Sequence, residues 1–282
     1  MGNAVRALKL FVAAGAALTL VAPAAQANVL DQIVIAHRGG ATSTFGEGTL
    51  ASYKESVKNH ADILDGDIHW TKDSPKDKDK LGSVIIIHDS TLDRITNCKG
   101  KVSSWLWSSI RDKCFVNVGV DDKKRHRLIR LKDLVAYAKS EGKPLGIGLK
   151  NSKITNAQAK QLWNTIKTSN VQLEAPLSRL AALNKVKKLD KADPKHKINY
   201  ALTTTGAAGW PSVSTAKSVG KYLHARLELP ASRMRAYKKA GIKVFLFTGK
   251  SVSDYKKMAA LDPYGVVVDD VAKFQAWRDK QT

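Results

Sequence analysis

The sequence predicts a parallel α/β fold whose eight strands close into a single (β/α)8 TIM barrel. Short apolar or β-branched runs alternate with stretches of helical spacing, the pattern of a parallel sheet with crossover helices. No internal repeat and no low-complexity linker divides the chain into two domains. The predicted strands are residues 33–36, 62–67, 145–150, 170–174, 197–203, 221–226, 243–248 and 265–269.

Amphipathic helices are expected between these strands. Leu131, Leu134 and Ala138, for example, recur at the period that places apolar side chains on one helix face. The sequence Leu-Asp-Pro at 261–263 should end the last predicted helix, because proline cannot continue one. The clearest predicted helices are residues 131–140, 156–168, 177–189 and 251–260.

One apolar run, residues 84–87, does not fit the alternation. It follows the second strand after a polar stretch, residues 71–82, that is too short and too charged for a crossover helix. A parallel partner would need a connection of about a dozen or more residues. We therefore predict that residues 68–88 form a hairpin excursion above the second strand. Residues 90–130 are predicted to be a larger insertion before the third strand.

This insertion holds both cysteines of the chain, Cys98 and Cys114. In an oxidising compartment such a pair predicts one disulfide, worth about 3 kcal/mol in the chain-entropy model, with two free thiols as the alternative. The insertion also holds Trp105 and Trp107. We expect them to form a small satellite core; stacking on a substrate headgroup is the alternative.

The first 27 residues have the features of a secretory signal peptide. Arg6 and Lys9 precede an uncharged apolar run, residues 10–22, and Ala25-Gln26-Ala27 offers a small-residue cleavage site. The run is shorter than the about 20 residues that span a bilayer, and no later segment is apolar enough to do so. We expect residues 1–27 to be removed and residues 28–282 to be secreted as one domain. A buried helix or an uncleaved anchor is the alternative.

The chain is strongly basic, with 47 Lys and Arg against 25 Asp and Glu and a formal net charge of +22. Such a charge attracts anionic material, for example phospholipid headgroups or a phosphate-bearing wall polymer. A solvated lysine-rich surface is the alternative, because the lysines are spread out. No basic helix or aromatic-basic motif stands out, so we expect no nucleic-acid partner.

Polar side chains gather at the predicted carboxyl ends of the strands. Barrel active sites lie at these ends, so side chains from different strands should meet at one rim. Each residue alone has an ordinary structural explanation, such as a cap or a solvated charge, but together they indicate a site. They are His37, Arg38, Asp65, Asp67, His88 and Lys150.

This set suits the cleavage of a phosphodiester. Two imidazoles can act as base and acid near neutral pH. A guanidinium can hold phosphate oxygens bidentately, and an ammonium adds a point charge. Asp65 and Asp67 face the same side of a strand and can share one hard divalent cation.

The same residues resemble the glycerophosphodiester phosphodiesterase family, and the resemblance extends over essentially all of residues 28–282. The order and spacing of five motifs carry it. They are His37-Arg38-Gly39, Glu47-Gly48-Thr49, Asp65-x-Asp67, His88-Asp89 and Leu92-Asp93-Arg94-Ile95-Thr96-Asn97.

The resemblance implies a TIM barrel that hydrolyses a small glycerophosphodiester to an alcohol and glycerol 3-phosphate. In it, His37 and His88 would be the acid-base pair. Arg38 and Lys150 would contact the phosphate. The implied cofactor is a divalent cation, Ca²⁺ or Mg²⁺, held by carboxylates. The implied metal ligands are Glu47, Asp65 and Asp67.

Four positions depart from the family pattern. Gly46-Glu47-Gly48 stands where the family has Pro-Glu-Asn, and Asp65 stands for a longer glutamate. Gly148 replaces a metal-binding glutamate on the third strand, which should weaken the cation or change its identity. Our hypothesis is that Glu174, on the neighbouring strand, reaches across to complete the metal site. His69 faces the same side as Asp67, so a ligand role for it also stays open.

Two other functions remain open. One is a sphingomyelinase D-like or other phospholipase, motivated by the missing third-strand carboxylate and the basic surface. The other is a non-catalytic protein that binds phosphorylated ligands on a decayed site, which Gly46, Gly48 and Gly148 favour. Retention of both His37 and His88 argues against pure binding.

Overall fold

A computed structural model of the chain describes residues 31–74, 81–117, 126–204 and 209–281. The predicted signal peptide, residues 1–27, lies outside the described residues.

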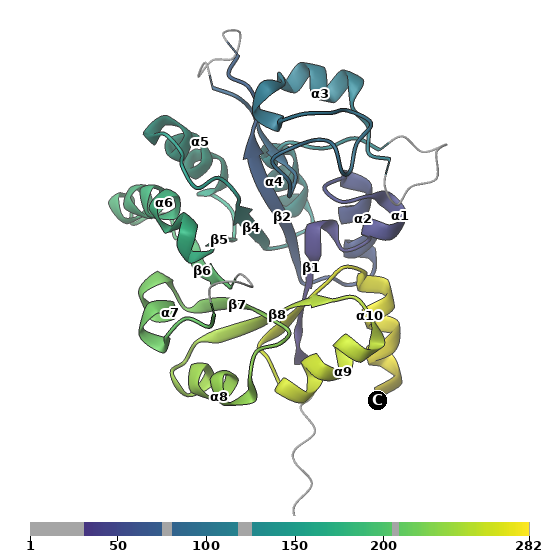
Figure 1. Ribbon diagram of the computed structural model, residues 1–282, viewed down its shortest axis with the longest axis vertical. Coiled ribbons are helices and arrows are strands. Elements are labelled where there is room, and N and C mark those ends of the chain that lie inside the picture. Colours follow the sequence, from purple (N-terminus) through teal and green to yellow (C-terminus); the bar gives the residue numbers. More distant parts are fainter. Residues whose placement is uncertain (1–30, 75–80, 118–125, 205–208, 282) are drawn as a thin grey trace, which may run out of the picture.

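Within the described residues, eight parallel strands form a closed barrel, which confirms the predicted fold class (Figure 1). Their order is β1-β9-β8-β7-β6-β5-β4-β2, and pairing of Ile35 with Ile63 closes the ring between β1 and β2. The strands are β1 (Ile33–Ala36), β2 (Ile63–Trp70), β4 (Leu145–Leu149), β5 (Val171–Ala175), β6 (Asn199–Thr203), β7 (Tyr222–Arg226), β8 (Lys243–Gly249) and β9 (Gly265–Val268).

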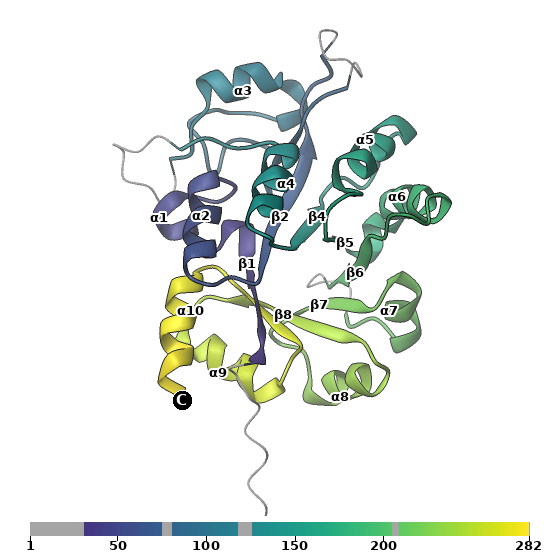
Figure 2. The same cartoon turned by 180° about the vertical axis from the view of Figure 1, so that it is seen from behind.

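Helices surround the barrel on its outside, as Figures 1 and 2 show from opposite sides. The side chains of Thr155 and Ser251 cap the N-termini of two of these helices, and each takes part in a capping box. The predicted helix 177–189 is a short 3-10 turn, Leu177–Arg179, followed by an α-helix. The helices are α1 (Thr42–Phe45), α2 (Leu50–Lys58), α3 (Trp107–Lys113), α4 (Leu131–Ser140), α5 (Asn156–Ile166), α6 (Leu180–Ala192), α7 (Val213–Val219), α8 (Ala231–Lys239), α9 (Val252–Leu261) and α10 (Val271–Arg278).

The strand period of two divides each strand between two environments. Outward residues pack against the helices in the main apolar core, while Ile35, Phe245 and Val267 form a small cluster inside the barrel. Asp65 and Asp67 lie on the same inward face of β2 as Ile63, further toward its carboxyl end. The interior therefore changes from apolar to polar toward the mouth, where catalysis takes place in such barrels.

β2 is longer than predicted, and this length builds the excursion. Beyond the barrel it pairs antiparallel with β3 (Val84–Ile86), so that Ile68 lies opposite Ile86. The predicted hairpin is therefore confirmed. Asp67 lies inside a strand, one residue before the barrel pairing with β4 ends at Ile68.

The insertion before β4 has a core of its own, next to α3. Ile87, Leu92, Ile95 and other apolar residues are buried there, and Trp105 and Trp107 pack against them, which confirms the predicted satellite core. The predicted disulfide between Cys98 and Cys114 is present. None of the described helices is long and apolar enough to cross a bilayer.

We predict that replacing both Cys98 and Cys114 by serine lowers the free energy of unfolding by about 3 kcal/mol. The bond closes a short loop, with a sequence separation of 16, and so limits the unfolded chain. Calorimetry should show a melting temperature about 5–10 °C lower, and wild type under reducing conditions is the matched control. A melting temperature that is the same with and without reductant would contradict this prediction.

Candidate active site

A tight turn after β1 carries His37 and Arg38 to the mouth of the barrel. Arg38 has a left-handed backbone, with φ 51° and ψ 27°, and Gly39 and Gly40 follow with φ 110° and 66°. A Cβ on Gly40 would lie 2.7 Å from the Cγ2 of Val271. Only glycine fits this close approach to α10. The local sequence therefore determines the backbone positions of His37 and Arg38.

His37 is held by a carboxylate from the neighbouring strand. Its Nδ1 donates to the Oδ1 of Asp269, which follows β9, at 2.5 Å. Burial alone would raise the pKa of Asp269, but the hydrogen bond and charge of His37 outweigh it and lower that pKa. This bond leaves Nε2 as the ring nitrogen free for a substrate. Asp269 was not predicted as a site residue, although a carboxylate at the end of the last strand was a usable signal.

His88 is held in the same way. Its Nδ1 donates to the Oδ1 of Asp89 at 2.7 Å, and Arg94 donates to the Oδ2 of Asp89 at 2.6 Å. The hydrogen bond from Arg94, followed by the one from His88, lowers the pKa of Asp89 to about 2. Burial lowers the pKa of His88 despite the opposing charge of Asp67. The ring is thus kept neutral around pH 7, the state in which it can accept a proton.

Glu47 joins two guanidinium groups. Arg94 donates to both of its carboxylate oxygens, at 2.7 Å and 3.0 Å, and Arg38 donates to Oε2 at 3.1 Å. Glu47 is 8% exposed, so its carboxylate is largely shielded from water. Arg94 was part of the motif read from the sequence, but its contact with Glu47 depends on the fold.

Asp65 and Asp67 lie side by side in the barrel interior, 4% and 5% exposed. Burial, with the charges of Glu174 and Asp67, raises the pKa of Asp65 well above its usual range. Burial alone would also raise the pKa of Asp67, but the charges of Lys150, His88 and Arg38 outweigh it and lower that pKa. Burial and the neighbouring charges thus shift the pKa values of the two carboxyls in opposite directions.

Both oxygens of Asp67 face cations. Its Oδ1 lies 2.9 Å from the Nζ of Lys150, and its Oδ2 lies 3.5 Å from the Nε of Arg38. Gly148 is the register partner of Asp67 on β4, and a Cβ there would overlap Oδ1. The position of this carboxylate therefore depends on the glycine that replaces the expected glutamate.

Glu174 lies on β5, which flanks β4 on the side away from β2. It is the register partner of Gly148 there, and it is buried. Its Oε2 accepts a hydrogen bond from the hydroxyl of Thr203 at 2.8 Å and lies 3.1 Å from the Nδ1 of the buried His224. The hypothesis that Glu174 completes a metal site stays a prediction; its carboxylate is held by β6 and β7. His69 lies with its Nε2 3.2 Å from the backbone oxygen of His88.

The carboxylates implied as metal ligands do not fit a divalent cation. In the ranges that the structure describes, no three or more His, Cys, Asp or Glu side chains are arranged to hold an ion. Glu47 is bound by two guanidiniums and Asp67 by an ammonium and a guanidinium. A hard cation would have to displace these groups before it could bind.

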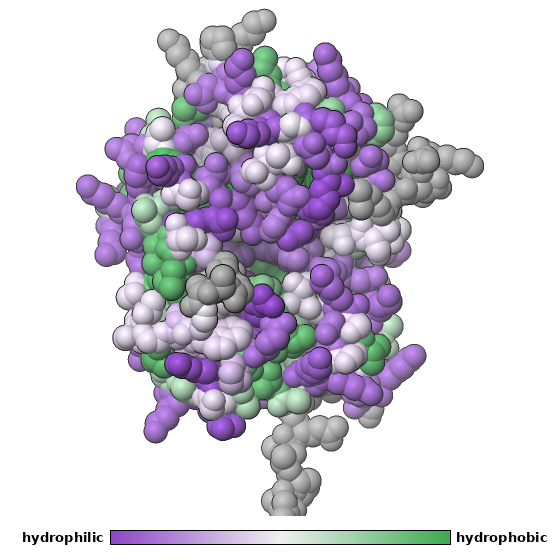
Figure 3. Space-filling view, in the orientation of Figure 1, coloured by the Kyte–Doolittle hydropathy of each residue, from purple (hydrophilic) through white to green (hydrophobic). Residues whose placement is uncertain are grey.

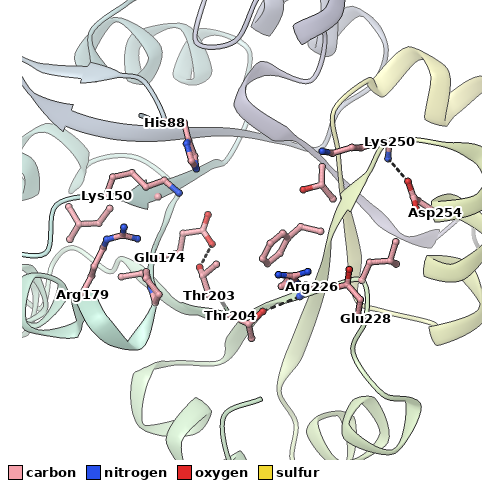
Figure 4. A pocket seen from close by; sticks show the side chains of 17 residues that line it. His88, Lys150, Glu174, Arg179, Thr203, Thr204, Arg226, Glu228, Lys250 and Asp254 are labelled. Atoms are coloured by element: carbon pink, nitrogen blue, oxygen red, sulfur yellow. Dashed lines mark hydrogen bonds and ion pairs between the residues drawn. The ribbon is translucent and has the colours of Figure 1, made fainter. Parts of the chain in front are cut away.

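A pocket of about 540 Å³ opens at the mouth beside these residues. His88, Lys150 and Glu174 point into it from three elements (Figure 4). Arg179, Arg226 and Lys250 also line it. The pocket thus offers a hydrogen-bonded imidazole, several cations and room for a small phosphodiester.

The sequence model of the glycerophosphoryl diester phosphodiesterase family matches residues 37–273. The chain is 27% identical over 149 residues to the uncharacterized protein YqiK of Bacillus subtilis, 51% of this chain and 56% of that protein. It is 34% identical over 82 residues to a glycerophosphodiester phosphodiesterase of Caldanaerobacter subterraneus, 29% of this chain and 30% of that one. The chain thus spans about half the length of the first relative and under a third of the second.

Solved structures share the fold. A phosphodiesterase of Oleispira antarctica, in complex with the product sn-glycerol-3-phosphate, has a TM-score of 0.74 at 19% identity over 90% of this chain and 99% of that one. A glycerophosphodiester phosphodiesterase of Agrobacterium tumefaciens has a TM-score of 0.67 at 21% identity over 87% and 99%. At these identities the likeness establishes the barrel alone.

We predict that Asp269→Asn changes the tautomer of His37, because the amide can donate its N–H to Nδ1, whereas the carboxylate can only accept from it. Nitrogen NMR of the imidazole should show protonation shifted from Nδ1 to Nε2 at pH 8. Asp270→Asn is the matched control, since Asp270 caps α10 through the Lys273 amide. Protonation on Nδ1 in both variants would contradict the role of Asp269.

Proposed function

The chain belongs to the glycerophosphoryl diester phosphodiesterase family, and we propose that it hydrolyses glycerophosphodiesters to an alcohol and glycerol 3-phosphate. The observation that carries this proposal is the pair of imidazoles at the barrel mouth. His37 and His88 each donate through Nδ1 to a carboxylate, which leaves Nε2 of each ring available. His88 lines the cationic pocket, and His37 directly follows β1 at the same rim of the barrel. Pure binding needs no such oriented proton-transfer groups.

The two imidazoles divide the proton transfers between them. In the first step a neighbouring hydroxyl of the glycerol attacks phosphorus, and one imidazole takes its proton. The bond from phosphorus to the leaving alcohol breaks, and the other imidazole protonates that oxygen. Water then opens the cyclic phosphate with the proton roles reversed, which yields glycerol 3-phosphate. Asp269 and Asp89 keep both rings in the required orientation.

Arg38 and Lys150 bind the phosphate in this proposal. Both lie at the mouth, anchored to the buried Asp67, so their positive charges are in place before a substrate arrives. Preorganised charge of this kind stabilises the charge that develops in the transition state. The family implies Ca²⁺ or Mg²⁺ at Glu47, Asp65 and Asp67, but the described geometry does not fit one. The proposed steps therefore use only the side chains of this protein.

We predict that His37→Ala and His88→Ala each reduce kcat by at least about 100-fold, the usual effect of removing a general acid or base. The assay is release of glycerol 3-phosphate from glycerophosphocholine by the purified protein. His196→Ala is the matched control, because His196 precedes β6 and so lies at the opposite end of the barrel.

Wild-type rates in either variant would remove that histidine from the mechanism. Turnover of intact sphingomyelin or lysophospholipid, with none of glycerophosphodiesters, would favour a sphingomyelinase D-like phospholipase. Saturable binding of glycerol 3-phosphate without turnover of any diester would favour the non-catalytic alternative.

We also propose that the protein is secreted after removal of residues 1–27. The small-residue site Ala25-Gln26-Ala27 after an apolar run supports this. The net charge of +22 would then hold the enzyme near anionic lipid headgroups or wall polymers. Hydrophilic residues cover most of the face seen in Figure 3, which suits an aqueous surrounding.

We predict that the exported protein begins at Asn28, as read by mass spectrometry of its N-terminal peptide. Ala27→Arg should block cleavage, because signal peptidase needs a small residue there. Gln26→Ser is the matched control, since the middle position tolerates change. An exported protein that retains Met1 would contradict this prediction.

A further inference from the structure

We propose that the ammonium group of Lys150, with the guanidinium of Arg38, takes the place of the divalent cation, so that hydrolysis proceeds without a metal ion. This inference rests on the proposed function. It departs from the divalent cation that the resemblance to the family implies. Four features of the site support it.

The first feature is the contact between Asp67 and Lys150. The 2.9 Å ion pair occupies the carboxylate oxygen that would otherwise face an ion. It exists because residue 148 is glycine: a Cβ there would overlap the Oδ1 of Asp67 and approach the Cε of Lys150 to 3.7 Å. The glycine that stands in place of one acidic ligand therefore also leaves room for a second one beside a lysine.

The second feature is Glu47, whose two oxygens accept three hydrogen bonds from guanidinium groups. Arg94 forms a two-point contact with it, and Arg38 adds a third bond. Two-point guanidinium-carboxylate contacts are among the strongest polar interactions in proteins. A divalent ion would have to break this contact in a place where Glu47 is largely shielded from water.

The third feature is the balance of charge. Glu47, Asp67 and Asp89 supply three carboxylates at the mouth, and Arg38, Arg94 and Lys150 supply three positive charges in direct contact with them. Divalent ions favour sites with an excess of carboxylate charge. Here each of these carboxylates already has a cationic partner, so there is no excess of carboxylate charge among them.

The fourth feature is the direction of Lys150. Its side chain points into the pocket next to His88, as Figure 4 shows, and both residues line that pocket. Its anchor, Asp67, is buried, so the ammonium group is fixed without closing off the pocket. A fixed ammonium at this place can neutralise phosphoryl charge that builds up during the reaction.

Under this inference Glu174 serves its neighbours on β6 and β7 and not an ion. It lies across from Gly148, but its Oε2 is held by Thr203 and His224. Within the described ranges it forms no acidic cluster suited to an ion.

Direct metal binding tests the inference independently of turnover. The secreted protein is treated with chelator and titrated with Ca²⁺ and with Mg²⁺ by calorimetry. We expect no saturable binding below about 1 mM, the weak end of protein calcium sites. We also expect the same rate on glycerophosphocholine with EDTA as with either ion.

Two variants sharpen the test. Lys150→Met should lower kcat by at least about 100-fold with no rescue by Ca²⁺ or Mg²⁺, as expected for a lost transition-state charge. Lys153→Met is its control, because Lys153 is exposed three residues further on. Gly148→Glu should displace Asp67 from Lys150 and create measurable Ca²⁺ binding.

Saturable Ca²⁺ or Mg²⁺ binding by the wild type below this limit, or loss of activity in EDTA with recovery on adding an ion, would overturn the inference. Absence of any turnover would instead count against the proposed function, while the calorimetric result would still decide metal binding. The wild-type measurements decide the inference whether or not the Gly148→Glu variant folds.

Discussion

A continuous chain of ion pairs crosses the mouth of the barrel, and the rest of the site depends on it. It joins β4, β2, the turn after β1 and the excursion, so segments far apart in sequence share one set of charges. Breaking a buried pair by removing one partner costs about 3–5 kcal/mol, because the other charge stays buried. The residues that form these ion pairs are, in order, Lys150, Asp67, Arg38, Glu47, Arg94, Asp89 and His88.

This series of ion pairs explains why the glycines of the site matter. Gly39 and Gly40 let the backbone turn sharply after β1, so that Arg38 reaches both Glu47 and Asp67. Gly148 leaves room for the carboxylate of Asp67 beside Lys150. What looks like decay in the sequence, a glycine at position 148 where the family has a glutamate, is thus a condition for the ionic arrangement that the structure contains.

Much of the fold followed from local patterns. The eight barrel strands and the excursion could be predicted because strand period, helix period and connection length are local properties of the chain. The length of β2 could not, since its last residues are ordered by pairing with β3. Asp269 was missed for a related reason: its importance arises only when β9 closes the barrel next to β1.

The sequence by itself determined the barrel, the disulfide pair and the residues gathered at the rim, because strand ends and motif spacing are written along the chain. Only the tertiary structure decided how those residues are paired. Glu47, Asp65 and Asp67 read as metal ligands from their chemistry, yet folding brings guanidinium and ammonium groups against two of them. Which charge neutralises a carboxylate depends on distances of a few ångströms between strands, and spacing along the chain does not contain those distances.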